Sequence, residues 1–277
     1  PGDEVVIFEP FYENYGPDTI LSESVPRFVS LRAPEFTFDP GELKAAIGPS
    51  TRAIIVNTPH NPTGHVFTFE ELEYIRDLCV EFNLVAVTDE VYEHIIFDGR
   101  RHISLATLDG MRDRTVTINS LSKTYSVTGW RIGYVMAPPA ITEGIRKVHD
   151  CLSVGAAAPL QEAAAVALSL PDSYYADLAS MYEEKRGILQ QFLRSAEFPF
   201  FEPQGAYYIM VDVSRFGAKD DVDFAMRLVR EHGVATVPGS SFYSTEGLGK
   251  DYVRFTFSKR EETLRDAGER LLNAIAG

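Results

Sequence analysis

Residues 53–92 read AIIVNTPHNPTGHVFTFEELEYIRDLCVEFNLVAVTDEVY, and this stretch decides the fold. Two short runs, 53–57 at its start and 84–88 near its end, are apolar at almost every position rather than at every second one. Strands that are covered on both faces show this pattern, and such strands belong mostly to parallel sheets. Residues 68–82, between the two runs, have a helical pattern that begins with a T-x-x-E capping box. The stretch therefore predicts an α/β protein with a mostly parallel sheet.

The same alternation of strand and helix extends in both directions, as far as about residue 170. A helix is expected over 39–48, where Asp39 would be the N-cap and Pro40 the first helical residue. Further strands are expected over 4–8, 27–31, 115–118 and 132–136. We therefore expect residues 1–170 to form a large domain in which helices sandwich the sheet.

A different pattern follows residue 170. A long helix is expected over 171–196, with Pro171 as its first residue and an acidic first turn. The later elements are expected to be strands over 206–213, 234–238 and 252–258 and helices over 221–232 and 260–275. We therefore expect residues 171–277 to form a smaller C-terminal α/β domain.

The composition excludes several classes of protein. The chain of 277 residues is 45% hydrophobic, which is enough for a real core, and its formal net charge is −14. An acidic protein is a poor partner for nucleic acid or for an anionic membrane. The sequence also contains no apolar run of the ~20 residues that span a bilayer. Its two cysteines, Cys79 and Cys151, are far apart, so we expect two buried free thiols and a cytoplasmic protein.

The chain begins with PGDEVVIF, so that a turn leads at once into a strand. A domain that opens directly on a core strand is expected to be preceded by more chain. We therefore expect the large domain to be incomplete at its N-terminus.

Polar motifs follow three of the predicted strands, at the point where each strand ends. One strand leads into NTPHNPTG at 57–64, the next into DEVY at 89–92, and a third into NSLSK at 119–123. Ligands of open parallel α/β sheets bind beyond the carboxyl ends of the strands. We therefore expect the side chains of these three motifs to surround a ligand.

Lys123 follows a buried strand and lies close in sequence to Ser120, Ser122 and Arg131. A lysine in such a place usually extends to solvent, but its neighbours favour another interpretation. Two hydroxyl groups and a planar guanidinium are the donors that a phosphate group needs. A lysine beside a phosphate site suits a phosphorylated aldehyde, because the amine forms a Schiff base while the donors hold the phosphate.

Four motifs resemble those of the class I/II aminotransferase family of fold-type I pyridoxal-phosphate enzymes. They are SLSKTYSVTGWRIGY at 120–134, NTPHNPTG at 57–64, TDEVYEH at 88–94 and YVRFTFS at 252–258. The resemblance implies pyridoxal 5′-phosphate as the cofactor and transfer of an amino group from an L-amino acid to a 2-oxo acid. It further implies a Schiff base on Lys123, a ping-pong reaction through a pyridoxamine intermediate, and a homodimer that acts in amino-acid metabolism.

The same resemblance implies catalytic roles for three residues. Lys123 would form the Schiff base and then move a proton between the substrate Cα and the cofactor. Asp89 would pair with the pyridinium nitrogen and keep it protonated. Tyr92, together with Asn61, would hydrogen-bond the phenolic oxygen of the cofactor ring. Tyr12, in EPFYENY, would stack on that ring, although a core aromatic residue is also consistent with its sequence.

The remaining implied roles concern the phosphate and the substrate. Ser120, Ser122 and Arg131 would hold the phosphate group. Arg254 would bind the α-carboxylate of the substrate through its planar guanidinium, with Asn61 beside it. Further phosphate donors, including a tyrosine of a neighbouring subunit, would belong to the stretch that is expected before residue 1.

Other candidate residues have simpler interpretations. His60 is expected to serve local structure, and Trp130 is expected to be a packing residue. No metal site is expected, because no typical ligand spacing links His94, His102 and His149.

Two other functions stay open. One keeps the cofactor and Lys123 but eliminates a group from the β-carbon, as in lyases that act on cysteine S-conjugates. The other is a non-catalytic domain that senses the cofactor within a regulator. Lys123, Asp89 and Arg254 together fit an enzyme more simply than a sensor.

Overall fold

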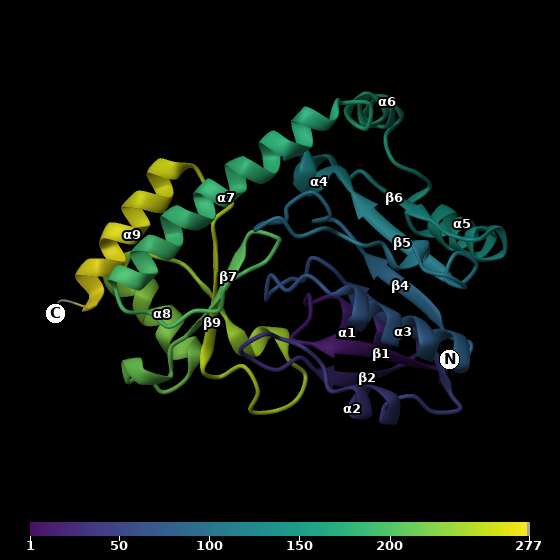
Figure 1. Cartoon of the computed structure of the whole chain (residues 1–277), viewed down its shortest axis with the longest axis horizontal. Helices are drawn as coiled ribbons and strands as arrows, with labels where there is room; N and C mark the ends of the chain where they lie inside the picture. Colours follow the sequence, from purple (N-terminus) through teal and green to yellow (C-terminus); the bar gives the residue numbers. More distant parts are fainter. Residues whose placement is uncertain (276–277) are drawn as a thin grey trace.

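The computed structural model describes residues 1–275, which form two β-sheets with helices around them (Figure 1). The larger sheet has six strands in the order β2-β1-β3-β4-β5-β6, and the smaller sheet has three in the order β7-β9-β8. The strands are β1 (Glu4–Glu9), β2 (Val25–Ser30), β3 (Thr51–Asn57), β4 (Val85–Asp89), β5 (Thr115–Ser120), β6 (Gly133–Met136), β7 (Tyr208–Asp212), β8 (Val237–Pro238) and β9 (Tyr252–Thr256). The helices are α1 (Tyr15–Leu21), α2 (Pro40–Ala45), α3 (Phe69–Glu81), α4 (Leu121–Thr124), α5 (Pro139–Ser153), α6 (Ala158–Ala167), α7 (Asp172–Ser195), α8 (Asp221–His232) and α9 (Glu261–Ile275).

The larger sheet confirms the expected fold class. Its strands β2, β1, β3, β4 and β5 all pair in parallel, and only β6 runs antiparallel to its neighbour β5. The apolar runs of β3 and β4 therefore lie inside the sheet, as their composition predicts. The parallel pairing also brings the carboxyl ends of five strands to one edge of the sheet.

Helix α3 begins where the sequence predicts it. Thr68 Oγ1 accepts a hydrogen bond from the backbone N–H of Glu71 at 3.2 Å, and a carboxylate oxygen of Glu71 accepts one from the N–H of Thr68 at 2.8 Å. These two bonds satisfy N–H groups that have no partner within the helix. The helix buries Leu72, Ile75 and Leu78, which are three residues apart and so share one face.

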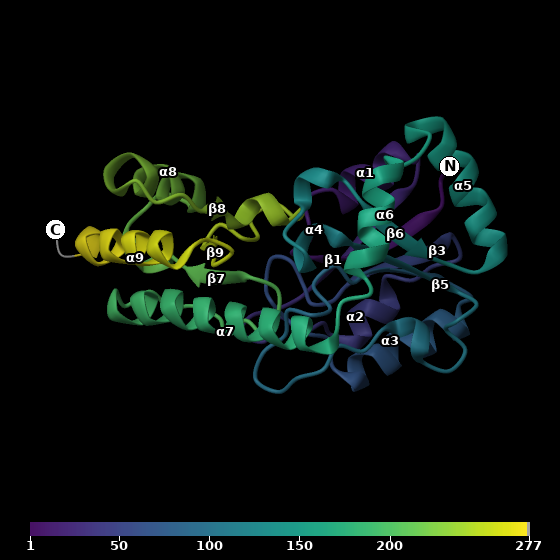
Figure 2. The ribbon, with the colours of Figure 1, turned by 90° about the horizontal axis from the view of Figure 1, so that it is seen from above.

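The two sheets have largely separate hydrophobic cores, although Met210 of β7 packs in the core of the larger sheet. One core joins the larger sheet to α2 and α3 through residues such as Leu43, Ile54 and Ile75. The other joins the smaller sheet to α7 and α9 and includes Leu189 and Leu271. Figure 2 shows the smaller sheet with α7, α8 and α9 at one end of the molecule and the larger sheet at the other. The domain boundary near residue 170 stays a prediction, and this arrangement is consistent with it.

Some expectations about single elements are wrong. Cys151 is exposed rather than buried, because α5 lies on the surface and buries none of its residues. Cys79 is buried as expected, and this burial raises the pKa of its thiol to about 12. Pro171 is the N-cap of α7 rather than its first residue, and α2 ends at Ala45 rather than near Gly48.

Four helices of the structure, α1, α4, α5 and α6, were not expected from the sequence. In the described residues, no helix is both long enough and apolar enough to cross a membrane.

Candidate active site

A cavity of about 230 Å³ opens beyond the carboxyl ends of β3, β4 and β5. Most of the residues expected at the site line this cavity, namely Tyr12, Asn61, Asp89, Tyr92, Ser120, Ser122, Lys123 and Arg131. Arg254 lies beside the cavity, where its Nη1 donates a hydrogen bond to Oδ1 of Asn61 at 2.6 Å. The cavity is also lined by residues for which no individual role was expected, namely Tyr15, Asn57, Val91, Thr128 and Tyr208. The structure thus brings all the expected site residues together.

Strand register sets the positions of the polar residues at the sheet edge. Asn57, the last residue of β3, is the pairing partner of Asp89, the last residue of β4. The side chain of Asn57 donates to the backbone carbonyl of Asp89 at 2.9 Å, and its Oδ1 accepts from the backbone N–H of Asn61 at 2.8 Å. Asn57 therefore joins the loop that carries Asn61 to the strand that carries Asp89.

Asp89 is a partly buried carboxylate with two donors. Tyr15 Oη donates to its Oδ2 at 2.6 Å, and the backbone N–H of Val91 donates to its Oδ1 at 3.3 Å. Burial raises the pKa of Asp89 above its ordinary value, although the hydrogen bonds and the charge of Lys123 act in the opposite direction. A cationic ligand atom near Asp89 would offset the cost of its burial.

The side-chain amine of Lys123 makes no hydrogen bond or ion pair with any residue that the structure describes. Its amine lies 5.9 Å from the ring centroid of Tyr207 and faces the cavity. Burial lowers the pKa of Lys123; Asp89 opposes this effect, while the nearby charges of Arg131 and Arg254 add to it. A lysine with a lowered pKa is more often neutral, and the neutral amine is the form that attacks an aldehyde.

The serine hydroxyls and Arg131 form a donor group at the other side of the cavity. Ser120 Oγ lies 2.6 Å from Ser122 Oγ and accepts a hydrogen bond from the backbone N–H of Ser122 at 3.0 Å. Arg131 has a left-handed backbone conformation with φ of 57°, and its Nη1 donates to the carbonyl of Thr128 at 3.0 Å. Its remaining N–H groups are free, within the described residues, to bind an anion.

Gly133 allows this donor group to form. A Cβ atom at this position would lie 2.8 Å from the carbonyl oxygen of Asn119, closer than real Cβ contacts occur. Only glycine therefore lets β6 approach β5 closely enough to bring Arg131 back beside Ser120.

Tyrosines surround the centre of the cavity. Tyr92 and Tyr208 are both buried, and their hydroxyl oxygens are 3.0 Å apart. Tyr12 is 38% exposed and packs edge-to-face on Tyr15, with ring centroids 5.6 Å apart. The exposure of Tyr12 does not fit a core residue, and it leaves the ring available to stack on a ligand.

The guanidinium of Arg254 is held by two aromatic rings. Its Cζ lies 4.1 Å from the ring centroid of Tyr208 and 4.6 Å from that of Phe242. Such contacts fix the plane of the guanidinium and leave its edge for an anion. An arginine in this setting suits a carboxylate at the mouth of the cavity.

A second group of ionisable residues lies nearby, and most of its polar atoms already have partners, although Nδ1 of His102 has none among the described residues. Glu90, Glu93 and His102 bring potential ligand atoms within 4.8 Å of one another, which their sequence spacing did not suggest. However, the carboxylate of Glu90 already accepts hydrogen bonds from Thr88, Ser104 and His102. The absence of a metal site stays a prediction.

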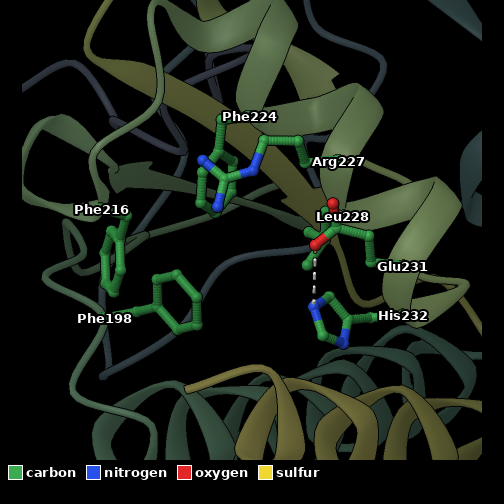
Figure 3. A pocket seen from close by; sticks show the side chains of 7 residues that line it. All are labelled: Phe198, Phe216, Phe224, Arg227, Leu228, Glu231 and His232. Atoms are coloured by element: carbon green, nitrogen blue, oxygen red, sulfur yellow. Dashed lines mark ion pairs between the residues drawn. The ribbon is translucent and has the colours of Figure 1, made fainter. Parts of the chain in front are cut away.

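A second cavity of about 230 Å³ lies beside α8, far from these groups in the fold. Figure 3 shows the rings of Phe198 and Phe216 on one side and an ion pair between Glu231 and His232 on the other. This cavity is lined by Phe198, Phe216, Phe224, Arg227, Leu228, Glu231 and His232. It offers neither a lysine nor a hydroxyl group, so of these two cavities only the first suits Schiff-base chemistry.

The donors of the first cavity fit a phosphorylated pyridine aldehyde. Lys123 offers an amine without a partner, Ser120 and Arg131 offer donors for a phosphate, and Asp89 offers a carboxylate for a protonated ring nitrogen. These groups line one cavity, and each of them complements a group of such a molecule, namely its aldehyde, its phosphate or its ring nitrogen.

Comparison with known proteins identifies the family. Residues 1–271 match the family model described as aminotransferase class I and II. The chain belongs to this family. It is therefore an aminotransferase, and pyridoxal 5′-phosphate is its cofactor.

Relatives of this aminotransferase cover almost its whole length. It is 38% identical to a probable N-succinyldiaminopimelate aminotransferase of Mycobacterium tuberculosis, over 98% of this chain and 71% of that protein. It is 37% identical to the methionine aminotransferase of Escherichia coli, over 98% of this chain and 70% of that protein. The solved structure of N-succinyldiaminopimelate aminotransferase from Mycobacterium tuberculosis has a TM-score of 0.95 and 39% identity, and the match covers 99% of this chain and 72% of that one.

Tyr15 and Asn57 are site residues of the aminotransferase that the motifs alone did not single out. Both contact Asp89, from 74 and 32 residues away in the sequence. No local pattern marks Tyr15, which is the first residue of α1.

Replacement of Tyr15 by phenylalanine tests its contact with Asp89. The hydrogen bond from Tyr15 lowers the pKa of Asp89, so Tyr15→Phe is expected to raise that pKa further. The carboxyl carbon shift of Asp89, followed by NMR against pH in protein labelled at aspartate, measures the change. Tyr12→Phe is the control and should leave the pKa of Asp89 as it is; an unaltered pKa in Tyr15→Phe would contradict the assignment.

Proposed function

We propose that this aminotransferase carries out its reaction in the cavity around Lys123, with an L-amino acid as donor and a 2-oxo acid as acceptor. The observation that carries the proposal is the half-buried amine of Lys123, which faces Asp89, the phosphate donors and Arg254 without a partner of its own. Bound pyridoxal phosphate supplies an electron sink for the pair of electrons released when the Cα–H bond of the amino acid breaks.

Lys123 and Asp89 are proposed to do the chemical work. The neutral amine of Lys123 would bind the aldehyde carbon of the cofactor and, once displaced by the substrate, would move the proton at the substrate Cα. The carboxylate of Asp89, held by Tyr15, would keep the ring nitrogen protonated. The direct bond from Tyr15 fixes the orientation of the carboxylate and lowers its pKa, which opposes the effect of burial.

The other cavity residues are proposed to bind and orient. Ser120, Ser122 and Arg131 would hold the phosphate, and Tyr12 would cover one face of the ring. Tyr92, fixed by its hydrogen-bonding contact with Tyr208, would bond the phenolic oxygen of the cofactor together with Asn61.

Arg254 is proposed to bind the α-carboxylate of the substrate. Asn61 accepts a hydrogen bond from Arg254 and therefore joins the cofactor side of the cavity to the substrate side. A carboxylate bound here would place the α-amino group towards Lys123.

The class of substrate is proposed from what the relatives share. Their names refer to N-succinyldiaminopimelate, methionine and, for a human relative with 36% identity, kynurenine and oxoglutarate. The three amino acids among these compounds differ in their side chains but share the α-amino and α-carboxylate groups, whereas oxoglutarate is a 2-oxo acid, the class proposed for the acceptor. All these relatives are named aminotransferases or transaminases, which favours transamination over β-elimination.

We further propose a homodimer and a cytoplasmic location. Apolar side chains of α5 such as Val148 and Leu152 are 59% and 80% exposed, which suits a surface that another subunit covers. The two free thiols, Cys79 and Cys151, suit a reducing compartment.

Chemical trapping tests the role of Lys123. Borohydride reduction of the protein loaded with pyridoxal phosphate is expected to attach the cofactor to Lys123, because this amine lines the same cavity as the phosphate donors. Peptide mapping by mass spectrometry locates the label. The label should be lost in Lys123→Ala and kept in Lys147→Ala, whose lysine is exposed on α5; label on another lysine of the unaltered protein would refute the assignment.

Replacement of Arg254 tests substrate binding. Arg254→Ala is expected to raise KM for the amino acid by about tenfold or more, because it removes a charge-assisted pair of hydrogen bonds to the carboxylate. The dissociation constant of pyridoxal phosphate should change by less than about threefold, because Arg254 does not line the phosphate side. Arg52→Ala is the control, because Arg52 lies at the end of β3 away from the cavity, and both binding constants should stay unchanged in it. Equal loss of substrate and cofactor binding would show that Arg254 has another role.

A further inference from the structure

Glu9 is a buried carboxylate at the end of β1 that the proposed chemistry does not use. It is 1% exposed, and no arginine, lysine or histidine nitrogen of the described residues forms an ion pair with it. A buried carboxylate without a cation is costly unless hydrogen-bond donors surround it. The groups that donate hydrogen bonds to the Glu9 carboxylate therefore identify the part of the chain that it holds in place.

Most of these donors come from a segment that is more than 230 residues away in the sequence. The backbone N–H groups of Ser244 and Thr245 donate to Oε2 of Glu9 at 3.1 and 3.2 Å, and the Thr245 hydroxyl donates to Oε1 at 2.5 Å. The hydroxyl of Ser30, on the neighbouring strand β2, completes the set at 3.3 Å. Glu9 thus binds the larger sheet to residues 239–245.

The 239–245 segment is also fixed to the elements of the smaller sheet. Its Ser240 N–H donates to Asp221 of α8 at 2.6 Å. A Cβ atom at Gly239 would lie 2.5 Å from the carbonyl oxygen of Gly249, so the segment packs closely against the turn before β9. Near Glu9, the backbone N–H of Phe11 donates to the carbonyl of Phe242 at 2.8 Å. The segment is therefore a short bridge between the two ends of the molecule.

The bridge carries one of the two rings that hold Arg254. Phe242 is fully buried within the segment, two residues before Ser244, and its ring centroid lies 4.6 Å from Cζ of Arg254. The other ring, Tyr208, belongs to β7 of the smaller sheet. A displacement of the segment would remove the Phe242 contact and leave the guanidinium supported by Tyr208 alone.

We propose that Glu9 is a positioning residue for the substrate-binding arginine. By holding Ser244 and Thr245, it keeps Phe242 against the guanidinium of Arg254 and so orients that side chain for the substrate carboxylate. The inference rests on the proposed role of Arg254 in substrate binding. It predicts that Glu9 affects amino-acid binding although it does not line the cavity.

Glu9→Gln and Thr245→Val test the contact from its two sides. Each is expected to raise KM for the amino donor about fivefold, because the segment loses a hydrogen bond to a buried charged group. The value of kcat and the dissociation constant of pyridoxal phosphate should stay within about twofold, since neither residue lines the cavity. Thr245→Val keeps Glu9 and the side-chain shape, so it remains informative if Glu9→Gln does not fold.

Ser30→Ala is the matched control, because it removes a donor to the same carboxylate without touching the segment. Its KM should equal that of the unaltered enzyme. A similar rise of KM in Ser30→Ala would indicate a general structural role and overturn the proposal. A fall of kcat that accompanies the rise of KM in Thr245→Val would do the same.

A double-mutant cycle with Arg254→Ala separates this inference from the proposed function. If Glu9 acts through Arg254, then Glu9→Gln or Thr245→Val should raise KM no further once Arg254 is alanine. Fully additive effects would overturn the inference and leave the role of Arg254 intact. An unchanged KM in Arg254→Ala itself would overturn the proposed substrate site, and this inference with it.

Discussion

Parallel pairing of β3, β4 and β5 is the constraint on which the site depends. In this register the last residues of β3 and β4, Asn57 and Asp89, stand side by side, and Ser120 ends the next strand. The loops that follow the strands then deliver Asn61 and Lys123 to the same space. Because the parallel strands all end at the same edge of the sheet, polar side chains that are spread over some seventy residues of sequence line one cavity.

Burial at this edge has an electrostatic consequence. Lys123, Arg131 and Arg254 bring three positive groups to one region, and Asp89 is the carboxylate that faces them. Burial raises the pKa of Asp89 and lowers that of Lys123, so the two charged forms are both less favoured than in water. A ligand with a phosphate, an aldehyde and a basic ring nitrogen would offset these costs together, which explains how the buried Ser122 and the half-buried Lys123 can lie in one cavity with the exposed Arg131.

Local sequence predicts the elements well where one interaction dominates. The runs AIIV and LVAV predicted buried parallel strands, and Thr68 with Glu71 predicted the start of α3, because burial on two faces and a capping box leave direct patterns. The meeting of the expected site residues in one place could also be predicted from the sequence, since these residues follow strands that end at the same edge of the sheet. Their individual roles stay proposals, supported by the contacts described above.

Other features depend on contacts between distant parts of the chain. The bond from Tyr15 to Asp89 and the donors of Glu9 in the 239–245 segment have no local pattern, because each partner looks ordinary in its own segment. The exposure of Cys151 was missed for a related reason. Helix α5 has a strongly apolar face, and this pattern suggests burial although the face is open in the single chain.

The pKa of the Lys123 amine in cofactor-free protein shows whether this amine is partly buried beside Asp89. Reductive methylation with carbon-13 formaldehyde and NMR titration would measure it, with Lys147 as an exposed reference. We expect a value below the 10.5 of an ordinary lysine, and a still lower value in Asp89→Asn, because Asp89 is the charge that raises it. A value at or above 10.5, or one that does not respond to Asp89→Asn, would show that Lys123 is not held beside Asp89 in a partly buried site.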